Sequence, residues 1–188
     1  MESALEVFAE SGFKATRMEE VARRAGVSKG AVYLYFEAKA DLFRAVVRDA
    51  VTPNIEAVKA VAETAPSLEI ALRAAYPALA ARVITDRRIS GVAKLVIAES
   101  RTQPELAAIW HETVVLPGVE LFSDMIRAAQ ERGEVRPGDP RAFAFGLMGP
   151  MLLSLVWRET FEPIGATPID VPALAAQHLE TVLKGMKP

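Results

Sequence analysis

A helical pattern that stops and restarts within eighteen residues constrains this chain more than any other feature. The segment Glu19–Phe36 reads EEVARRAGVSKGAVYLYF. Apolar residues three and four apart predict a short helix that ends before Gly26, and Ser28 is a typical N-cap for a second one. Glycine adopts a positive φ without strain, so the turn at Gly26 can be tight. The sequence therefore predicts two short helices that cross steeply, a helix-turn-helix.

Helical spacing of apolar residues continues through nearly the whole chain. The 188 residues are 51% hydrophobic, enough for a sizeable core. Strand-like alternation is rare and hairpin dipeptides are absent, which favours an all-α fold. We expect about nine helices, the first three forming the helix-turn-helix part, over residues 3–11, 18–25, 29–36, 39 to beyond 50, 67–85, 87–102, 104–132, 140–161 and 171–186.

Caps and prolines refine these boundaries. Thr16 and Glu19 have the spacing of a capping box, which predicts the start of the second helix. Pro53 is expected to end or kink the fourth helix, and Pro117 to split the seventh. We place the domain boundary near residues 51–54, with a helix-turn-helix domain over residues 1–50 and a larger helical domain over residues 51–188.

Charge is unevenly distributed between these two parts. The whole chain carries a net charge of −2, but residues 14–48 hold eight cations and four anions, a local charge of +4. The remaining residues therefore carry −6. A local basic surface can attract phosphate while the rest of the protein stays acidic. We interpret the N-terminal part as a DNA-binding surface.

The second helix of such a motif enters the major groove by its N-terminal end. Lys29 at that end can reach a phosphate or a guanine edge. Tyr33 and Tyr35 point away from the predicted packing residues Val32 and Phe36, so their hydroxyls are free for phosphate. The candidate DNA contacts are Thr16, Arg17, Ser28, Lys29, Gly30, Tyr33, Tyr35 and Lys39. Ordinary surface charges on a small helical bundle are the alternative.

Residues 4–47 resemble the DNA-binding domain of the TetR family of bacterial transcriptional regulators. The matching pieces are FAESGFKAT, VARRAGVSKGAVYLYF and KADLF. The resemblance implies a homodimer, usually a repressor, that leaves its operator when a small ligand binds the C-terminal domain. It places the family's DNA contacts on the eight residues named above. Residues 88–161 also resemble C-terminal domains of the AefR-like branch, while Leu34 departs from the family's usual aromatic or polar contact residue.

The larger part carries more apolar surface than one chain needs. Residues 140–161 show two apolar stripes, one containing Phe143 and Leu147 and the other Phe145 and Leu152. One stripe can face the chain's own core, and a second copy would cover the other in a two-fold four-helix bundle. The candidate dimer residues are Phe143, Leu147, Leu155, Leu174, His178, Leu179 and Val182. The alternative is that both stripes lie in the core.

A ligand cavity needs apolar walls and a few polar groups. The candidate pocket residues are Tyr76, Trp110, His111, Val114, Phe122, Met125, Met148 and Met151. His111, Glu99, Arg101 and Ser154 are candidate polar anchors. This composition favours a small hydrophobic effector, and ordinary core packing is the alternative for each apolar residue.

Several other classes are excluded or disfavoured. The absence of cysteine excludes disulfides and thiolate metal sites and favours the cytoplasm. The two histidines lack metal-ligand spacing, and no phosphate-binding loop or nucleophile motif is present, so we expect neither an enzyme nor a cofactor. The apolar run over residues 142–157 is shorter than the roughly 20 residues of a spanning helix, so we expect no membrane partner.

The expected function is therefore a ligand-responsive transcriptional regulator, most often a repressor, that binds palindromic double-stranded operator DNA. Two rivals remain at this point. One is an activator, or a regulator of the same fold that answers to a protein. The other is a helical binding protein or enzyme whose DNA-binding part has decayed.

Overall fold

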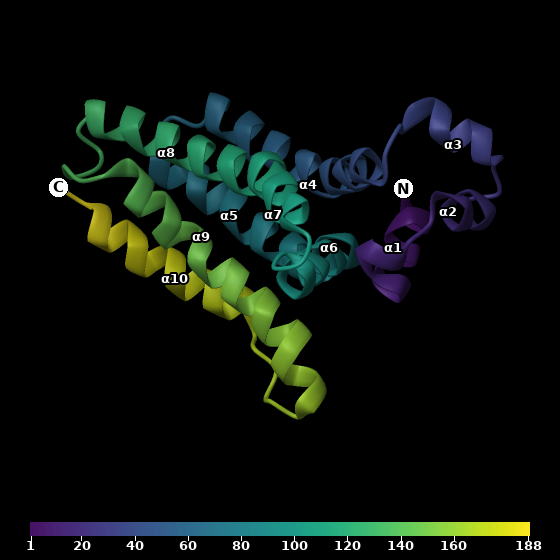
Figure 1. Cartoon of the computed structure of the whole chain (residues 1–188). Helices are drawn as coiled ribbons and strands as arrows, with labels where there is room; N and C mark the ends of the chain where they lie inside the picture. The colour runs from purple at the N-terminus through teal and green to yellow at the C-terminus, as the bar shows by residue number, and fades with distance from the viewer. The chain divides into compact units, whose positions relative to one another are not determined.

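The computed structural model describes residues 1–188 and contains helices but no strand. The predicted all-α fold is confirmed, and the helices form nine continuous stretches. Figure 1 labels the ten α-helices that make up these stretches. They are α1 Glu2–Ala15, α2 Met18–Arg24, α3 Lys29–Tyr35, α4 Lys39–Thr64, α5 Leu68–Thr85, α6 Arg87–Glu99, α7 Pro104–Trp110, α8 Leu116–Glu131, α9 Pro140–Val156 and α10 Val171–Met186.

The chain packs as two compact units. The first contains Met1–Thr52 and Arg87–Val115, and the second contains Pro53–Asp86 and Leu116–Pro188. Helices α6 and α7 thus belong to the unit that holds the predicted helix-turn-helix, although they follow it by more than thirty residues. The functional domains predicted at 1–50 and 51–188 stay a prediction.

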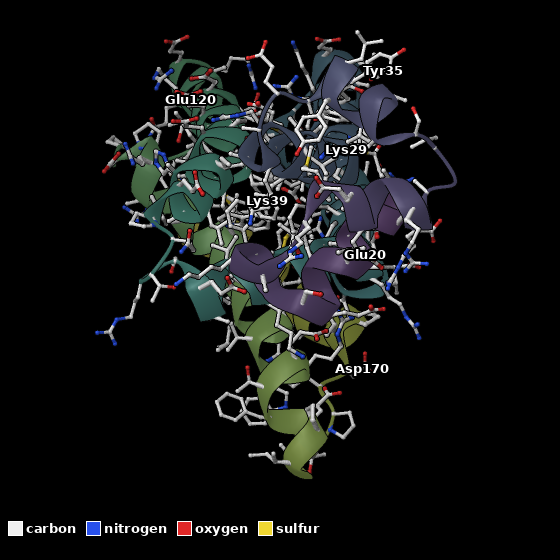
Figure 2. The ribbon with its side chains drawn as sticks, turned by 45° about the vertical axis from the view of Figure 1, so that its right-hand side comes forward. Glu20, Lys29, Tyr35, Lys39, Glu120 and Asp170 are labelled. Atoms are coloured by element: carbon white, nitrogen blue, oxygen red, sulfur yellow. The ribbon has the colours of Figure 1, made fainter.

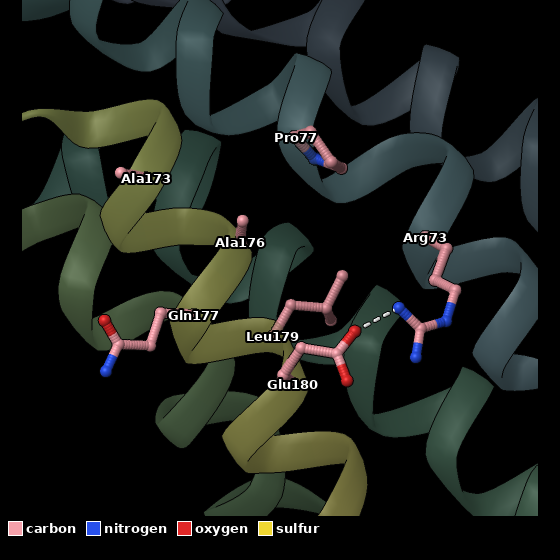
Figure 3. A pocket seen from close by; sticks show the side chains of 7 residues that line it. All are labelled: Arg73, Pro77, Ala173, Ala176, Gln177, Leu179 and Glu180. Carbon is pink, nitrogen blue, oxygen red and sulfur yellow. Dashed lines mark hydrogen bonds and ion pairs between the residues drawn. The ribbon is translucent and has the colours of Figure 1, made fainter.

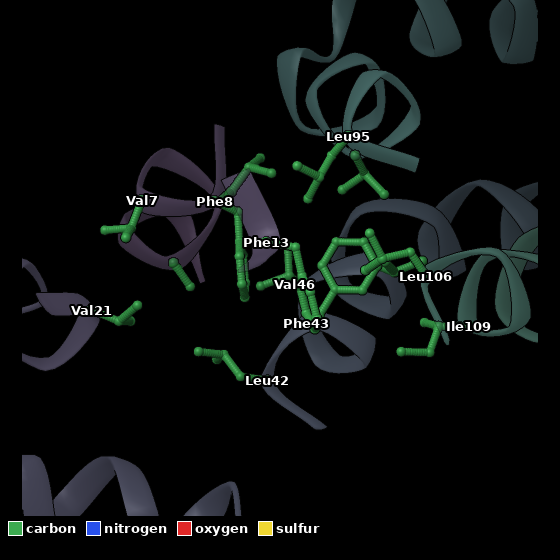
Figure 4. Close-up of a cluster of buried hydrophobic side chains, with 14 of the residues drawn as sticks. Val7, Phe8, Phe13, Val21, Leu42, Phe43, Val46, Leu95, Leu106 and Ile109 are labelled. Atoms are coloured by element: carbon green, nitrogen blue, oxygen red, sulfur yellow. The ribbon is translucent and has the colours of Figure 1, made fainter. Parts of the chain in front are cut away.

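The first unit is built around three aromatic rings. Phe8 stacks on Phe13 with ring centroids 5.6 Å apart, and Phe43 from α4 meets both rings edge-on. All three side chains are almost completely buried. Leu106 and Ile109 of α7 belong to the same cluster, as Figure 4 shows. These rings fix the position of α1 against α4. Buried residues of α2 and α3, among them Val21 and Val32, pack in the same cluster.

The second unit is a bundle of α5, α8, α9 and α10 with the C-terminal part of α4. Helix α9 packs against α8 and α10, and α10 also packs against α5. The Tyr76 hydroxyl of α5 donates to the Leu147 carbonyl of α9 at 2.7 Å. Because Pro150 has no N–H, the carbonyl of Gly146 lacks its helical partner. His178 Nε2 lies 2.8 Å from that oxygen, so the ring donates from Nε2.

Three local predictions have different outcomes. Pro53 lies inside α4, which continues to Thr64, so it does not end the fourth helix. The predicted division of the seventh helix is found just before Pro117, where a π-helix, His111–Val115, joins α7 to α8. There is no capping box at α2: Arg17 is the N-cap and makes no side-chain cap bond, while the Thr16 hydroxyl donates to the Gly12 carbonyl at 2.7 Å.

The helical segment that contains α9 is also longer than its sequence suggests. A π-helix, Trp157–Phe161, and a 3₁₀ turn, Glu162–Ile164, extend it. The stretch Pro140–Ile164 is long and apolar enough to cross a membrane by length and composition alone. The length argument against a span therefore does not hold. One face of α9 is packed in the second unit, where Ala144 and Leu147 are buried.

Candidate nucleic-acid interface and ligand-binding half

Helices α2 and α3 are joined by the four residues 25–28, in a turn that favours glycine at position 26. Gly26 has φ 69°, in the left-handed region. The Val27 N–H donates to the Ala22 carbonyl at 3.0 Å, which closes the end of α2. The Ser28 hydroxyl accepts from the Ala31 N–H at 3.1 Å, which confirms Ser28 as the N-cap of α3. The local sequence thus fixes where α2 ends and α3 begins.

The exposed face of α3 carries the predicted tyrosines. Val32 is buried, whereas the side chains of Tyr33, Leu34 and Tyr35 are 40, 79 and 77% exposed. Lys29 and Tyr35 project from the ribbon of α3 in Figure 2. This face is free of the core, as the sequence predicts, and it offers two phenol hydroxyls and one ammonium to a partner. Leu34 places an apolar side chain at its centre.

Lys29 is not free in this structure. Its ammonium lies 2.5 Å from Glu19 Oε1 of α2 and 5.6 Å from the centroid of the Tyr33 ring. The hydrogen bond with Glu19 raises the pKa of Lys29, and the hydrogen bond with Lys29 lowers the pKa of Glu19. Both groups are therefore charged near neutral pH.

The other predicted contacts divide by exposure. Arg17 and Gly30 are exposed. Thr16 is buried, and its hydroxyl donates a hydrogen bond to the Gly12 carbonyl. The Lys39 ammonium donates to the carbonyls of Lys14 and Thr16 at 2.9 and 3.1 Å. Burial lowers the pKa of Lys39. For Thr16 and Lys39, the structure thus shows a role in the fold, and their DNA contacts stay a prediction.

Glu99 supports this region in a way the sequence did not suggest. Its carboxylate accepts from the N–H of Phe13 at 3.0 Å and from the N–H of Lys14 at 3.4 Å. Gly12 makes room for it, with φ 75° and an added Cβ 2.5 Å from Glu99 Oε1. The structure thus shows a role of Glu99 in the fold, and its role as a ligand anchor stays a prediction. The glycine at position 12 is the one signal that the sequence offers for this contact, and it does not identify Glu99 as the partner.

The predicted pocket residues fall in different units. Trp110, His111 and Val114 belong to the first unit, and the other five belong to the second. In the second unit, the largest buried ones are Tyr76, Phe122 and Met151, while Met125 and Met148 pack partly buried against the same core.

One buried polar atom in the second unit has no partner. The Ser154 hydroxyl of α9 makes no hydrogen bond, and the residue is 2% exposed. Its place is three residues beyond Met151, on the buried face of α9. A buried hydroxyl left unpaired costs about 1–3 kcal/mol, so Ser154 stands out as a group that a ligand could satisfy.

Part of the predicted dimer surface lies inside the core. Leu147, Leu155 and Leu179 are buried among residues of their own chain, because the stripe that holds them faces α5, α8 and α10. Their assignment to the dimer interface was therefore wrong. The His178 ring makes a hydrogen bond with the Gly146 carbonyl of its own chain. Phe143 and Val182 are partly buried and pack against the core. Leu174 is half-buried.

The other stripe of α9 is the exposed one. Phe145, Leu152 and Leu153 are 50, 54 and 61% exposed, and Gly146 and Gly149 between them are exposed as well. The exposed residues of this stripe are apolar, and the Arg141 guanidinium lies 5.8 Å from the centroid of the Phe145 ring at its N-terminal end. The sequence identifies both stripes of this helix, but it cannot tell which one the core covers.

A shallow groove of about 480 Å³ lies between α5 and α10 (Figure 3). An ion pair between Arg73 and Glu180 closes one side of it. Of the predicted dimer and pocket residues, only Leu179 lines it. The full lining is Arg73, Pro77, Ala173, Ala176, Gln177, Leu179 and Glu180.

Two family models match the chain. Residues 1–46 match the model described as bacterial regulatory proteins, tetR family, and residues 65–171 match the tetracyclin repressor-like C-terminal domain. The second match alone covers more than half of the chain.

Curated relatives include both an activator and a repressor. The chain is 38% identical over 76 residues to the HTH-type transcriptional activator FasR of Mycolicibacterium smegmatis, 40% of this chain and 35% of the relative. It is 27% identical over 136 residues to the HTH-type transcriptional repressor BepR of Brucella suis, 71% of this chain and 65% of the relative. The matched regions thus span less than two thirds of either relative's own length.

Solved structures share the fold along the whole chain. FadR of Bacillus subtilis in complex with stearoyl-CoA aligns with a TM-score of 0.76 at 20% identity, covering 98% of this chain and 96% of that one. The SmeT–triclosan complex aligns with a TM-score of 0.81 at 21% identity, covering 100% and 89%; SmeT is the repressor of a Stenotrophomonas maltophilia efflux pump. At these identities the likeness concerns the fold.

Proposed function

The chain belongs to the TetR family of bacterial transcriptional regulators, and we propose that it is a repressor whose homodimer binds a palindromic operator until a small hydrophobic effector releases it. As a member of this family it is a DNA-binding regulator and not an enzyme. The observation that carries the proposal is the exposed face of α3, which presents Lys29, Tyr33 and Tyr35 outside the core. We place its action in the cytoplasm, with no membrane partner.

In the proposed complex, α3 is the helix that reads the major groove. Lys29 contacts a phosphate or a guanine edge, and the hydroxyls of Tyr33 and Tyr35 bond phosphate oxygens. Arg17, exposed at the start of α2, holds the flanking backbone. All eight predicted contacts remain candidates. Thr16 and Lys39 also stabilise the backbone of residues 12–16, which carries the chain into α2.

A second copy of the chain is the proposed cover for the exposed stripe of α9. Phe145, Leu152 and Leu153 would otherwise leave a continuous apolar surface in water, which is costly. Exposed glycines at 146 and 149 let another helix approach closely. A two-fold axis that pairs α9 and α10 of two copies would give a four-helix interface. A dimer of this kind matches the two halves of a palindromic operator.

A hydrophobic effector is proposed for the second unit. The thioether of Met148 lies beside Gly118, where an added Cβ would come within 3.0 Å of its terminal methyl, and methionine adapts its shape to apolar ligands. Ser154 supplies an unpaired hydroxyl for the polar end of the ligand. FadR with stearoyl-CoA and SmeT with triclosan, which share this fold, hold ligands with large apolar parts.

Release from DNA is proposed as a population shift. A ligand changes DNA affinity only if it binds the conformations with different affinities. Helix α4 begins at Lys39 beside the helix-turn-helix and contributes residues to both compact units. We therefore assign to α4 the link between effector binding and the spacing of the two α3 helices in the dimer.

The test starts from DNA, because the operator is unknown. Purified protein is used to select fragments from genomic DNA of its source, and the enriched site is footprinted. The proposal expects a palindrome protected over a promoter, and a Kd that weakens when stearoyl-CoA or triclosan is added as a probe. Protection upstream of a promoter would favour an activator. Absence of any salt-dependent DNA binding would overturn the proposal.

A further inference from the structure

The ion pair between Lys29 and Glu19 lies on the proposed DNA-reading surface. Lys29 is the first residue of α3, and Glu19 lies in the first turn of α2. The two charged atoms are 2.5 Å apart, and their side chains are 61 and 49% exposed. Tyr33 lies beside the same ammonium, with its ring centroid 5.6 Å away. Lys29 is therefore engaged by an acid of the protein itself, on the surface proposed to meet DNA.

This pair contributes little to the fold. Exposed ion pairs contribute about 0–1 kcal/mol to stability, and salt weakens them further. Neither side chain closes a buried contact. Glu19 also lies on a stretch where two of the proposed DNA contacts, Arg17 and Lys29, are cationic, and both charges lower its pKa. Its carboxylate thus reduces the positive charge that α2 and α3 present to a phosphate.

The consequence for DNA binding follows from competition. Lys29 can neutralise a phosphate only after it leaves Glu19, and the carboxylate then stands unpaired beside a polyanion. Non-specific complexes derive essentially all of their affinity from phosphate contacts, so this cost affects them fully. A complex in which Lys29 meets a guanine edge gains about 1–3 kcal/mol of discrimination, which can offset the cost.

We propose that Glu19 is a specificity-determining residue: it retains Lys29 in non-specific complexes and releases it only where the operator offers a matching base edge. This inference rests on the proposed function, since it assumes that α2 and α3 face DNA. It assigns to an acidic residue of the recognition surface a role against binding to random sequence.

The experiment measures binding of the full-length protein to a labelled random-sequence duplex over a range of salt concentrations. Glu19→Gln removes the charge and frees Lys29. We expect tighter binding at every salt concentration and a slope of log K against log salt that is steeper by about 0.9, the value for one added phosphate contact. Glu6→Gln is the matched control, because Glu6 is an exposed acid of α1 with no ion pair in the structure.

A double variant shows whether the effect passes through Lys29. Glu19→Gln with Lys29→Ala should have the slope of Lys29→Ala alone. Circular dichroism of each variant checks the fold, and Glu19→Ala provides a second removal of the carboxylate. Once an operator is known, Glu19→Gln should lower the ratio of operator to random-duplex affinity.

Different failures have different meanings. If Glu19→Gln and Glu6→Gln show the same slope, Lys29 is not released and the inference is overturned while DNA binding stands. If the double variant keeps the steeper slope, the gain does not pass through Lys29, and the inference is again overturned. If none of the proteins, wild type included, binds duplex DNA in a salt-dependent way, the proposed function and the inference fail together.

Discussion

The Glu99 carboxylate of α6 accepts a hydrogen bond from the backbone N–H of Phe13 at 3.0 Å. Its second oxygen lies 3.4 Å from the N–H of Lys14. These N–H groups follow Gly12, whose φ of 75° and ψ of 164° interrupt the helical backbone of α1. A residue 86 positions away in sequence therefore satisfies the donors that this break leaves free. The bond fixes the direction in which the chain enters α2.

Gly12→Ala should destabilise the protein by about 1–3 kcal/mol, because the backbone conformation at residue 12 is open essentially only to glycine. The new Cβ would also lie 2.5 Å from Glu99 Oε1, which forces that carboxylate to move. Urea unfolding measures the loss. Gly133→Ala is the control, since Gly133 has φ 74° but nothing within 4 Å of its added Cβ. An equal loss in both variants would mean that the Glu99 contact adds nothing.

Acid should weaken the protein partly through Glu134. Its carboxylate accepts from Arg132 at 2.5 Å and from the Leu68 N–H at the start of α5 at 2.8 Å, and both bonds lower its pKa below the usual 4.5. A depressed folded-state pKa gives stability that is present above the unfolded value and is lost as pH falls through the folded one. Glu134→Gln should therefore lose less stability than wild type between pH 5 and about pH 3.

The measurement is the urea midpoint at each pH. Glu131→Gln serves as the comparison, because Glu131 is an exposed acid at the last residue of α8, three residues before Glu134, with no hydrogen bond or ion pair in the structure. Identical acid sensitivity in the two variants would remove Glu134 from the explanation.

Phe145→Lys combined with Leu152→Lys should convert the proposed dimer to monomers. Each substitution places a charge on the exposed stripe of α9, where a partner helix would have to bury it unpaired. Light scattering after size-exclusion chromatography gives the mass directly. Ile70→Lys changes a residue of α5 that is equally exposed, at 50%, and should leave the mass unchanged. A dimer that survives the double change would place the interface elsewhere.

Lys29→Ala and Tyr33→Phe should each weaken operator binding without changing the oligomeric state. The first removes the ammonium proposed to meet a guanine edge, so it should cost about 1–3 kcal/mol of operator discrimination. The second removes one uncharged hydroxyl and should leave the salt slope unchanged. Lys59→Ala, at an exposed position of the second unit, is the charge-matched control. Wild-type affinity in both α3 variants would mean that α3 is not the reading helix.

Ser154→Ala separates ligand binding from stability. Because the Ser154 hydroxyl is buried without a partner, its removal should leave the free energy of unfolding unchanged or slightly raised. If the effector bonds this hydroxyl, the same variant should bind it about tenfold more weakly, the effect of roughly 1.4 kcal/mol. The melting temperature without ligand measures the change in stability, and its increase on adding ligand measures the change in ligand binding. A lower melting temperature without ligand would point to a structural role instead.

Local patterns decided most of what the sequence predicted correctly. The turn at Gly26, the cap at Ser28 and the outward direction of Tyr33 and Tyr35 depend on residues within one or two helical turns. The capping box failed although the competing contact is also local: the hydroxyl of Thr16 donates to the Gly12 carbonyl four residues earlier, and Arg17 is the N-cap of α2.

The sequence by itself determined the all-α fold, the two crossing helices and the existence of two apolar stripes on α9. Each of these features follows from the helical periodicity of one segment or from the glycine at the turn, so no distant contact is needed to predict it. Only the tertiary structure decided that Leu147 faces the core and Phe145 faces solvent, and that Glu99 and Glu19 hold Phe13 and Lys29. The physical reason is that burial and ion pairing depend on which distant element arrives at a given face, and the spacing of residues within one helix does not specify its neighbour.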